Sequence, residues 1–299
     1  MSPIESLNLS RQGGLIPLNK PTGMTSRQVV NRVERLTRPL KAGHAGTLDP
    51  LASGVLVVCI GPATRLIEYV QRMRKQYVGA FLLGRQSPTE DIEGEVVELP
   101  DATQPTLEQT ETAVRHFVGR ILQRPPAFSA LKIQGRPAYR LARQGRPVEL
   151  QPRPVEIHRI AVQSYQYPEL ILEVECGAGT YIRSLGRDLA ERLGTAAVMT
   201  ALRRTAIGQF CIESSIELDK LTVDGWTRYV ESPLRAVEGL PQIQLTSDEV
   251  ARIRNGQTIA RRDVEAAEIA ALDPDGQLVG ILEPAPDGRW RTRRNMPTP

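Results

Sequence analysis

The sequence predicts an α+β fold, with a mixed, largely antiparallel central sheet flanked by helices and followed by a small β-rich domain. Apolar runs of strand length recur along the chain without regularly spaced crossover helices, which argues against a doubly wound parallel sheet. Segments with apolar residues at helical spacing lie between some of these runs. From about residue 239 the expected strands become short and turn sequences frequent. We therefore expect one domain over residues 1–238 and a second over residues 239–299.

The first elements are a short strand and an amphipathic helix. Residues 14–18 are apolar enough for a strand, and the turn sequence Asn-Lys-Pro-Thr-Gly follows at residues 19–23. Thr25 and Gln28 have the spacing of a capping box, which marks the start of a helix. Three valines then give this helix one buried face, at positions 29, 30 and 33.

A glycine-rich segment, GHAGTLDPLASG at residues 43–54, precedes an unbroken apolar run at residues 55–60. Its glycines and its proline favour a loop over a helix or a strand. The apolar run is typical of a strand that is buried on both faces. Asp49 is therefore expected at the edge of a rigid sheet, although an aspartate before a proline is also a common turn former.

The remaining elements of the first domain follow from periodicity and from breaks. Helical spacing of apolar residues predicts helices over residues 66–73, 107–118 and 184–193, the last ended by Gly194. Strands are expected over residues 77–83 and 170–176. Residues 87–98 are too charged for a core and are expected to form an exposed loop or hairpin. Tyr181 and Arg183 then fall at a junction between a strand and a helix, where side chains are both exposed and fixed.

In the second domain, the pattern predicts a short helix after Ser247 that ends at Gly256. Short strands are expected to follow, separated by the turn sequences Asp-Pro-Asp-Gly at residues 273–276 and Pro-Asp-Gly at residues 286–288. No internal repeat accompanies this change of pattern. The C-terminal region is thus expected to be an independent, small β-rich unit.

The positive charge is carried mainly by arginine, since lysine occurs only at positions 20, 41, 75, 132 and 220. The net charge is +4 and the isoelectric point is about 9.1. Residues 131–160 hold seven basic residues against two acidic ones, and the tail from residue 284 holds four against one. Arginine binds phosphate through two donors and stacks on bases, which favours a nucleic-acid partner. Solvated surfaces without a ligand are the alternative interpretation of such charge runs.

Several classes of protein are disfavoured by what the sequence lacks. It has no apolar stretch long enough to cross a bilayer and no export signal at its start, so we expect a cytoplasmic protein. The cysteines at 59, 176 and 211 and the histidines at 44, 116 and 158 share no metal-ligand spacing, so neither a disulfide framework nor a metal site is expected. Without a P-loop or a dinucleotide fingerprint, no cofactor is expected either.

Asp49 is the first candidate for chemistry. A carboxylate that acts as a nucleophile or a base must be charged yet poorly solvated, which requires a nearby cation that stays charged when buried. Arginine suits that role, and Arg183 is a candidate because it lies on its own strand-to-helix junction. The sequence alone does not bring these two residues together.

The segment GHAGTLDPLASG resembles the catalytic motif of the TruB family of tRNA pseudouridine synthases. Further matches to this family follow in order along roughly the first 210 residues: LNKPTG at 18–23, KQY at 75–77, PAFSALKIQGRPAYRLARQG at 126–145, GTYIR at 179–183 and LRR at 202–204. Several ordered motifs are far more specific than one. The resemblance implies the pseudouridine synthase fold, with a small PUA-like RNA-binding domain at the C-terminus.

The resemblance also implies a reaction. The T-loop uridine at tRNA position 55 would be isomerised to pseudouridine by breaking the N1–C1′ glycosidic bond and rejoining the base through C5. Asp49 would be the nucleophile, attacking either the ribose anomeric carbon or the uracil ring. Arg183 would pair with Asp49 and keep it ionised and oriented. Tyr77 would stack on the uracil and could remove the proton from C5.

Substrate binding is assigned by the same resemblance. His44 would help to hold the nucleotide out of its stack, while Lys20 would support the site or touch backbone phosphate. Tyr181 and Leu202 would line the pocket. An insertion at about residues 124–153 would contact RNA through five residues, of which the last three could form a short helix: Lys132, Arg136, Tyr139, Arg140 and Arg143.

The expected partner is the T-arm of tRNA, bound by a monomer without membrane or metal. Three alternatives stay open: a dyskerin-like branch that works inside a ribonucleoprotein with a guide RNA, an RNA-binding or tRNA-folding protein with a vestigial catalytic site, and a small-molecule glycosyl enzyme. The intact basic insertion argues against the first, and the complete set of Asp49, Tyr77 and Arg183 argues against the second. The third predicts no salt-sensitive RNA affinity.

Overall fold

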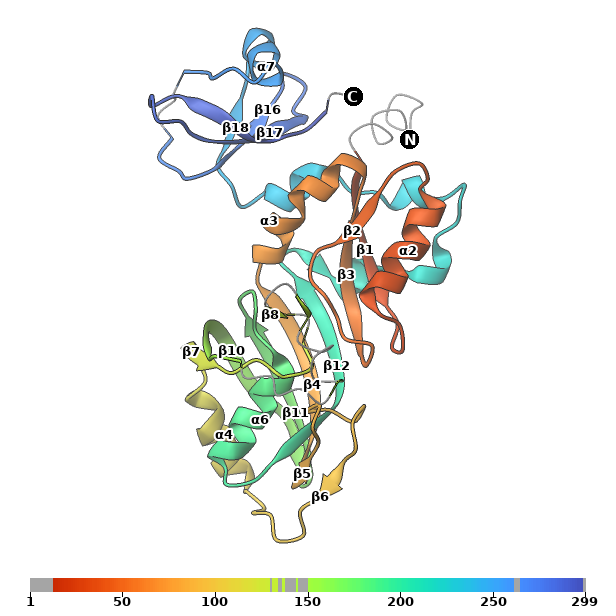
Figure 1. Cartoon of the computed structure of the whole chain (residues 1–299), viewed down its shortest axis with the longest axis vertical. Coiled ribbons are helices and arrows are strands. Elements are labelled where there is room, and N and C mark those ends of the chain that lie inside the picture. The colour runs from red at the N-terminus through yellow and green to blue at the C-terminus, as the bar shows by residue number, and fades with distance from the viewer. Residues whose placement is uncertain are drawn as a thin grey trace.

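The computed structural model describes residues 13–129, 131–133, 136–137, 144, 150–260 and 264–297. The molecule is elongated, with the C-terminal domain at one end and a long sheet running through the rest (Figure 1). None of the helices in these residues has both the length and the apolar composition that a bilayer-spanning helix requires.

The central sheet has ten strands. Its strands lie in the order β14 (Ile216–Glu217), β1 (Gly14–Lys20), β3 (Ala52–Ile60), β12 (Ala197–Ile207), β4 (Lys75–Leu83), β11 (Glu169–Cys176), β10 (Arg153–Gln166) and β7 (Gly119–Gln123), with β2 (Ala42–His44) beside β3 and β13 (Phe210–Cys211) beside β12. The pairs β1–β14 and β3–β12 are parallel, and the other neighbours are antiparallel. The predicted α+β class, with a mixed and largely antiparallel sheet, is thereby confirmed.

Strand β3 shows why its sequence is an unbroken apolar run. Val55, Val57 and Cys59 pack into one cluster with α3 (Ile67–Arg72) and the preceding 3₁₀ helix (Gly61–Leu66). The alternate residues Leu56, Val58 and Ile60 pack into another cluster with α2 (Ser26–Leu36). Both faces of the strand are therefore covered, as the apolar run predicted.

The glycine-rich segment is less of a loop than its composition suggested. Residues 43–44 belong to β2 and residues 52–54 to β3, so the connection between the two strands is only residues 45–51. Gly54 explains part of this error, because its φ of 101° and its close approach to β12 still require glycine within a strand. A Cβ at this position would lie 2.2 Å from the carbonyl oxygen of Arg204.

The helices begin and end largely where the sequence predicts. Thr25 and Gln28 form the expected capping box of α2. Helix α4 (Leu107–Arg115) is shorter than predicted, and α6 (Ile182–Arg192) is followed by Gly194 with a φ of 71°. Both α4 and α6 contribute to the cluster on β4, β10 and β11. Two hairpins stand apart from the sheet: β5 (Arg85–Gln86) with β6 (Val97–Glu98), and β8 (Lys132–Ile133) with β9 (Arg136–Pro137).

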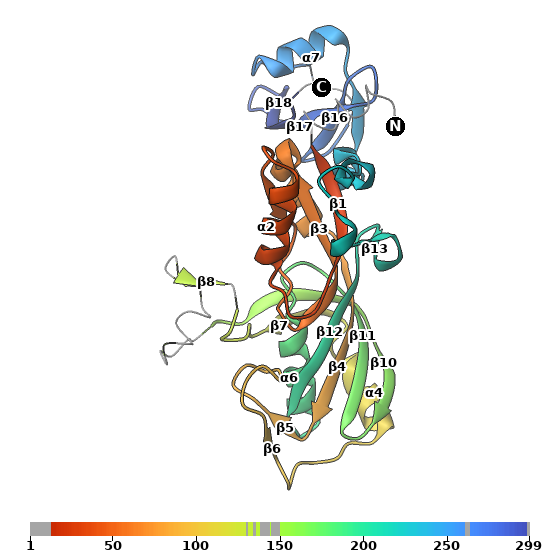
Figure 2. The same ribbon diagram turned by 90° about the vertical axis from the view of Figure 1, so that its right-hand side faces the viewer.

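The C-terminal region forms a separate four-stranded sheet in the order β15 (Gln242–Gln244), β16 (Ile269–Leu272), β17 (Leu278–Pro284) and β18 (Trp290–Asn295). Helix α7 (Ser247–Arg254) covers it, and Trp290 is fully buried in its core. The views of Figures 1 and 2 agree that this sheet lies next to α3. The expected boundary at residue 239 stays a prediction.

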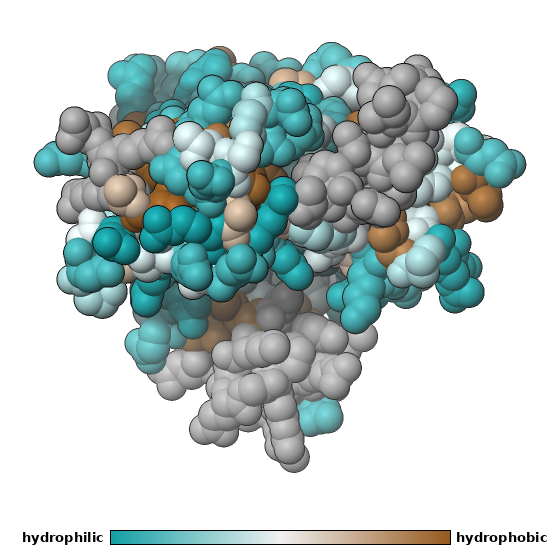
Figure 3. Space-filling view, turned by 90° about the horizontal axis from the view of Figure 1, so that it is seen from above, coloured by the Kyte–Doolittle hydropathy of each residue, from teal (hydrophilic) through white to brown (hydrophobic). Residues whose placement is uncertain are grey.

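The arginine-rich tail is engaged within the protein. Arg293 pairs with Glu68, Glu268 and Glu283, so it connects β18 with α3. Arg294 pairs with Glu68, and Arg291 pairs with Glu283. Seen from the end where the C-terminal domain lies, the coloured surface is mostly hydrophilic, with hydrophobic side chains in scattered groups (Figure 3).

Candidate active site

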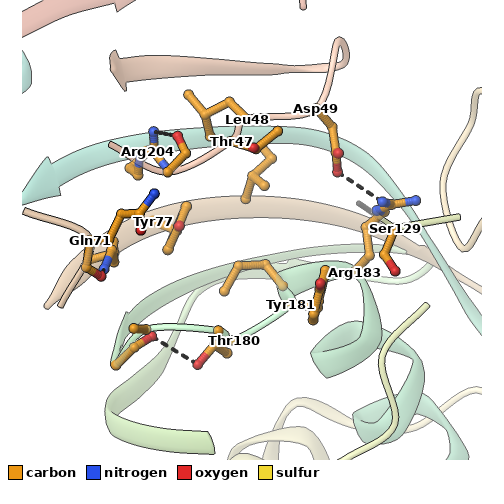
Figure 4. A pocket seen from close by; sticks show the side chains of 17 residues that line it. Thr47, Leu48, Asp49, Gln71, Tyr77, Ser129, Thr180, Tyr181, Arg183 and Arg204 are labelled. Carbon is orange, nitrogen blue, oxygen red and sulfur yellow. Dashed lines mark hydrogen bonds and ion pairs between the residues drawn. The ribbon is translucent and has the colours of Figure 1, made fainter. Parts of the chain in front are cut away.

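A cleft of about 350 Å³ lies between the connection that carries Asp49 and the start of α6 (Figure 4). Its walls come from β4, β12, α6 and the two connections at residues 45–51 and 177–181. The lining residues are Gly46, Thr47, Leu48, Asp49, Gln71, Lys75, Tyr77, Ser129, Gly177, Ala178, Gly179, Thr180, Tyr181, Ile182, Arg183, Leu202 and Arg204. The cleft thus gathers five of the residues singled out from the sequence: Asp49, Tyr77, Tyr181, Arg183 and Leu202.

Asp49 and Arg183 meet in this cleft. Oδ2 of Asp49 lies 3.0 Å from Nη2 of Arg183, and the side chains are 37% and 6% exposed. The carboxylate therefore keeps a face toward the cleft, while the guanidinium is almost completely enclosed (Figure 4).

The connection that carries Asp49 is held by the start of α2. The hydroxyl of Ser26, itself buried, accepts from Leu48 N–H at 2.8 Å and donates to Leu48 O at 3.0 Å. Pro50 O accepts from Gly23 N–H at 2.8 Å. These bonds fix the backbone on both sides of Asp49, which pre-organises its carboxylate.

Arg183 has a second carboxylate partner that the sequence analysis missed. Nη1 of Arg183 lies 3.0 Å from Oδ2 of Asp91, a side chain only 2% exposed. Asp91 also accepts from the hydroxyl of Thr89 at 2.6 Å and from Glu93 N–H at 3.1 Å. The expectation that residues 87–98 form an exposed loop is wrong for Asp91, because its charge is compensated by an arginine 92 positions later. No local signal in the sequence reports such a distant partner.

Arg183 is further fixed by two backbone carbonyls. Nη1 donates to Thr89 O at 2.8 Å, and Nη2 donates to Phe128 O at 3.0 Å. The guanidinium therefore contacts the Asp49 connection, the loop that carries Asp91 and the first part of the predicted RNA-contacting insertion. A planar group with several fixed donors is suited to such a junction.

Tyr77 and Arg204 lie opposite each other on β4 and β12. Arg204 is buried and donates from Nε to Val55 O at 2.7 Å and from Nη2 to Gly46 O at 3.1 Å, so it ties the Asp49 connection to β3. Burial raises the pKa of Tyr77, and the Arg204 guanidinium offsets part of the rise. The phenol therefore carries its proton at neutral pH.

Lys75 adds a second buried cation at this end of the cleft. Its ammonium group donates to the carbonyl oxygens of Gln71 and Met73. Burial lowers the pKa of Lys75 to about 8. The sequence analysis placed Lys75 in a motif without giving it a role, and the structure shows it bound to backbone oxygens.

Tyr181 and Leu202 also line the cleft. Tyr181 is the residue that precedes α6, and burial raises the pKa of its phenol. Leu202 is 8% exposed and offers an apolar surface. In Figure 4, Tyr181 lies near Arg183 at one end of the cleft, and Tyr77 lies near Arg204 at the other end.

His44 and Lys20 are not among the lining residues. His44 lies on β2, its Nδ1 is buried without a hydrogen-bond partner in the described structure, and burial, followed by the charge of Arg27, lowers its pKa. Lys20 is fully buried and donates to Pro21 O at 2.9 Å and Met24 O at 2.5 Å. Burial lowers the pKa of Lys20 to about 8. Its burial and its bonds to backbone oxygens are compatible with support of the site, and both roles expected for Lys20 stay predictions.

The predicted RNA-contacting residues are only partly covered by the described structure. Lys132 and Arg136 lie on the β8–β9 hairpin, which stands away from the central sheet (Figure 2). Tyr139, Arg140 and Arg143 lie outside the described residues. Within the described ranges, no group of three or more His, Cys, Asp or Glu side chains is arranged to hold a metal ion.

Comparison with known proteins identifies the family. The family model for the N-terminal domain of TruB family pseudouridylate synthases matches residues 34–182, and the model for the C-terminal domain of tRNA pseudouridylate synthase B matches residues 183–237. The chain is 39% identical to the tRNA pseudouridine synthase B of Mycobacteroides abscessus over 279 residues, covering 92% of this chain and 93% of the relative. It is 38% identical to that of Dehalococcoides mccartyi over 282 residues, covering 93% and 94%.

Solved structures share the fold. A crystal structure of a Cbf5-Nop10-Gar1 complex superposes with a TM-score of 0.73 at 27% identity, over 93% of this chain and 80% of the compared one. An H/ACA ribonucleoprotein bound to a substrate RNA containing 2′-deoxyuridine gives a TM-score of 0.75 at 24% identity, over 99% and 88%. The expected pseudouridine synthase fold is confirmed by these likenesses. The family models and the relatives show that this chain belongs to the TruB family of pseudouridine synthases.

Proposed function

We propose that this protein isomerises the T-loop uridine at position 55 of tRNA to pseudouridine, with Asp49 as the nucleophile. The observation that carries the proposal is the ion pair of 3.0 Å between Asp49 and the enclosed Arg183, in a cleft that also holds two tyrosines. The relatives named tRNA pseudouridine synthase B support tRNA as the substrate.

Asp49 has the geometry that a carboxylate nucleophile needs. One side of the group is held by Arg183, and the 37% exposed remainder is open to a substrate in the cleft. Attack on the ribose anomeric carbon or on the uracil ring would both use this open side. Arg183 would orient the carboxylate and balance its charge in the apo enzyme and during the reaction.

The reaction breaks the N1–C1′ bond, joins C5 to C1′ and transfers the C5 proton, so no atom is gained or lost. Tyr77 would stack on the uracil and receive the C5 proton. Burial raises the pKa of Tyr77 and leaves the phenol protonated at neutral pH, so Tyr77 can receive the C5 proton only as its own proton passes to another acceptor. Uracil N1 gains a proton in the product, so the net transfer is from C5 to N1. Leu202 would exclude water beside the base.

The target base must leave the RNA stack, which costs a few kcal/mol. Stacking on Tyr77 offsets part of this cost, and Tyr181 would hold the nucleotide from the other wall. His44 would keep the nucleotide out of its stack, and the insertion, through Lys132, Arg136, Tyr139, Arg140 and Arg143, would contact the T-arm. Binding should therefore weaken strongly with salt.

The domain division belongs to the same proposal. Residues 1–238 would form the catalytic domain, with the RNA-contacting insertion at about residues 124–153, and residues 239–299 a PUA-like RNA-binding domain. The separate four-stranded sheet from Gln242 to Asn295 supports this division.

The test is to incubate the protein with an unmodified tRNA transcript and to map pseudouridine by sequencing. We expect modification at position 55 by the unaltered protein and none by Asp49→Asn, with RNA affinity retained. A transcript with cytidine at position 55 controls for the site, and Asp219→Asn, at an exposed carboxylate, controls for the substitution. Turnover by Asp49→Asn would reject the nucleophile. Binding without turnover by the unaltered protein would favour the RNA-folding alternative.

A further inference from the structure

The helix that carries Arg183 begins without a cap of its own. Tyr181 is the N-cap residue of α6, with φ −104° and ψ 111°, and its side chain makes no capping hydrogen bond. Helices α2, α4 and α7 each begin with a threonine in a complete capping box. The start of α6 must therefore be fixed by another part of the chain, because its first backbone groups have no partners inside the helix.

Gln123 supplies that fixation from 58 residues earlier. Its Oε1 accepts from Tyr181 N–H at 2.8 Å, and its Nε2 donates to Tyr181 O at 3.0 Å. Tyr181 O also accepts the first bond of the helix, from Leu185 N–H at 3.0 Å. Gln123 is the last residue of β7 and only 1% exposed, so both bonds are shielded from water. One carboxamide thus pairs with both backbone groups of the residue that opens α6.

The residues that follow Gln123 also contact α6. Arg187 donates from Nη2 to Arg124 O at 2.8 Å, and Arg183 donates from Nη2 to Phe128 O at 3.0 Å. Arg183 and Arg187 are four residues apart, so they lie on one face of α6. The chain from Gln123 to Phe128 therefore lies against this face, and Gln123 is the first of its contacts.

The same Nη2 of Arg183 that bonds Phe128 O is paired with Asp49. A small rotation at the start of α6 would move this atom and the ring of Tyr181 together. Because a displacement of about 1 Å at a reacting group can cost about 100-fold in rate, the backbone of Tyr181 must be held closely.

We infer that Gln123 is a positioning residue for the reaction: its carboxamide sets the backbone of Tyr181 and thereby aims Tyr181 and Arg183 into the cleft. This inference rests on the proposed function. Gln123 would touch no reacting atom, since it is absent from the lining of the cleft.

The experiment compares Gln123→Met with a matched control, Gln109→Met. Gln109 makes a similar bond at another helix start, where its Oε1 accepts from Thr106 N–H at 2.7 Å, but it lies at α4 and not at the cleft. The single-turnover rate with excess enzyme, the RNA dissociation constant and the melting temperature would be measured for both variants at a temperature where both are folded. Hydrogen exchange at Tyr181 N–H would be followed by NMR or mass spectrometry.

We expect Gln123→Met to lower the single-turnover rate by about 100-fold, to leave the dissociation constant within about twofold and to speed exchange at Tyr181 N–H. Gln109→Met should leave the rate within about twofold even where its melting temperature falls. Should Gln123→Met fail to fold, Gln123→Asn keeps the polar group, but its shorter side chain cannot hold both backbone atoms.

Three results would overturn the inference: a rate within about twofold of the unaltered protein, an equal loss of rate in both glutamine variants, or unchanged exchange at Tyr181 N–H. If the unaltered protein forms no pseudouridine, the proposed function fails. The exchange measurement then still decides whether Gln123 holds Tyr181.

Discussion

At the scale of single residues, Arg183 is shared between an open carboxylate and a buried one. Asp49 faces the cleft, whereas the side chain of Asp91 is only 2% exposed and is therefore shielded from water. The two carboxylates therefore differ in their surroundings: Asp91 holds the guanidinium from the buried side, and Asp49 pairs with it from the cleft.

The first prediction concerns this buried partner. Asp91→Asn leaves Arg183 without one of its two carboxylates, and breaking a buried pair by removing one charge costs about 3–5 kcal/mol. We expect the free energy of unfolding, measured by urea denaturation, to fall by roughly this amount, with the modification rate falling as well. Asp219→Asn, whose side chain is 88% exposed, should change it by less than about 0.5 kcal/mol. Equal effects of the two substitutions would show that Asp91 holds nothing in place.

The second prediction separates the two roles proposed for Tyr77. Tyr77→Phe keeps the ring that would stack on uracil but removes the hydroxyl that would take the proton. We expect RNA affinity to stay within about twofold and the single-turnover rate to fall by about 100-fold or more, as is typical for loss of a proton-transfer group. Retention of the rate would leave stacking as the role of Tyr77.

Among individual residues, Asp49 and Arg183 could be singled out from the local pattern of the sequence, and Tyr77 from the motif that resembles one of the TruB family. Asp91 was not predicted, because an aspartate in a charged turn segment is expected to be exposed to solvent unless its distant partner is known. Lys20 was open between two roles for a similar reason. Its burial depends on β1 and α2 packing together, which a local pattern does not report.

At the scale of elements, α2 offers a basic surface that the sequence analysis did not consider. Arg27 and Arg35 on this helix and Lys41 after it are exposed, and no ion pair is found for them within the described residues. Arg32, in contrast, pairs with Asp219. Arg27 is close enough to His44 to lower its pKa, so this surface adjoins the proposed site.

The third prediction follows from this surface. If it contacts RNA phosphates, each lost contact lowers the slope of log affinity against log salt by about 1. We expect Arg27→Ala and Arg35→Ala to weaken tRNA binding at low salt and to reduce this slope, measured by filter binding across a salt series. Arg159→Ala, at an arginine that already pairs with Glu173, should leave the slope unchanged. If neither Arg27→Ala nor Arg35→Ala changed the slope, α2 would not be part of the RNA-binding surface.

Elements were predictable where burial leaves a regular pattern, on one face in α2 and on both faces in β3. The limits of the glycine-rich loop were not, since β2 becomes a strand by pairing with the end of β3, and the first residues of β3 by pairing with β12. Local composition favours turns there, and tertiary pairing overrides it.

At the scale of the whole molecule, ion pairs and an apolar cluster join the C-terminal sheet to α3. The cluster includes Leu66 and Val70 from one side and Leu278 and Ile281 from the other. At its edge, Glu68 pairs with Arg72, Arg293 and Arg294. Arg293 and Arg294, part of the basic tail that the sequence suggested for RNA binding, thus help to attach this domain.

The fourth prediction concerns this attachment. Because Glu68 has three partners in a partly exposed network, Glu68→Gln should lower the free energy of unfolding by about 1 kcal/mol at low salt. The loss should be smaller in 1 M salt, where the Debye length is only about 3 Å. Urea denaturation at both salt concentrations measures it, with Glu175→Gln, at a single pair with Arg74, as the control. An equal loss at low and high salt would mean that the ion pairs are not its cause.

The division into a large and a small β-containing unit could be anticipated from the change in strand length and turn frequency. The placement of the small unit could not. It depends on contacts such as that between Glu68 and Arg293, which are 225 positions apart. The sequence around neither residue indicates such a contact.

Strand β12 is the only neighbour that joins β3 to β4 in the described sheet, and it carries Leu202 and Arg204. β12 therefore lies between β3, which follows the connection that carries Asp49, and β4, which carries Tyr77, and its own Leu202 and Arg204 line the cleft. A shift of β12 against either neighbour would alter the gap between the Asp49 carboxylate and the Tyr77 ring. If these strand pairings hold during the proposed reaction, the large movement falls to the nucleotide, which has to leave its stack.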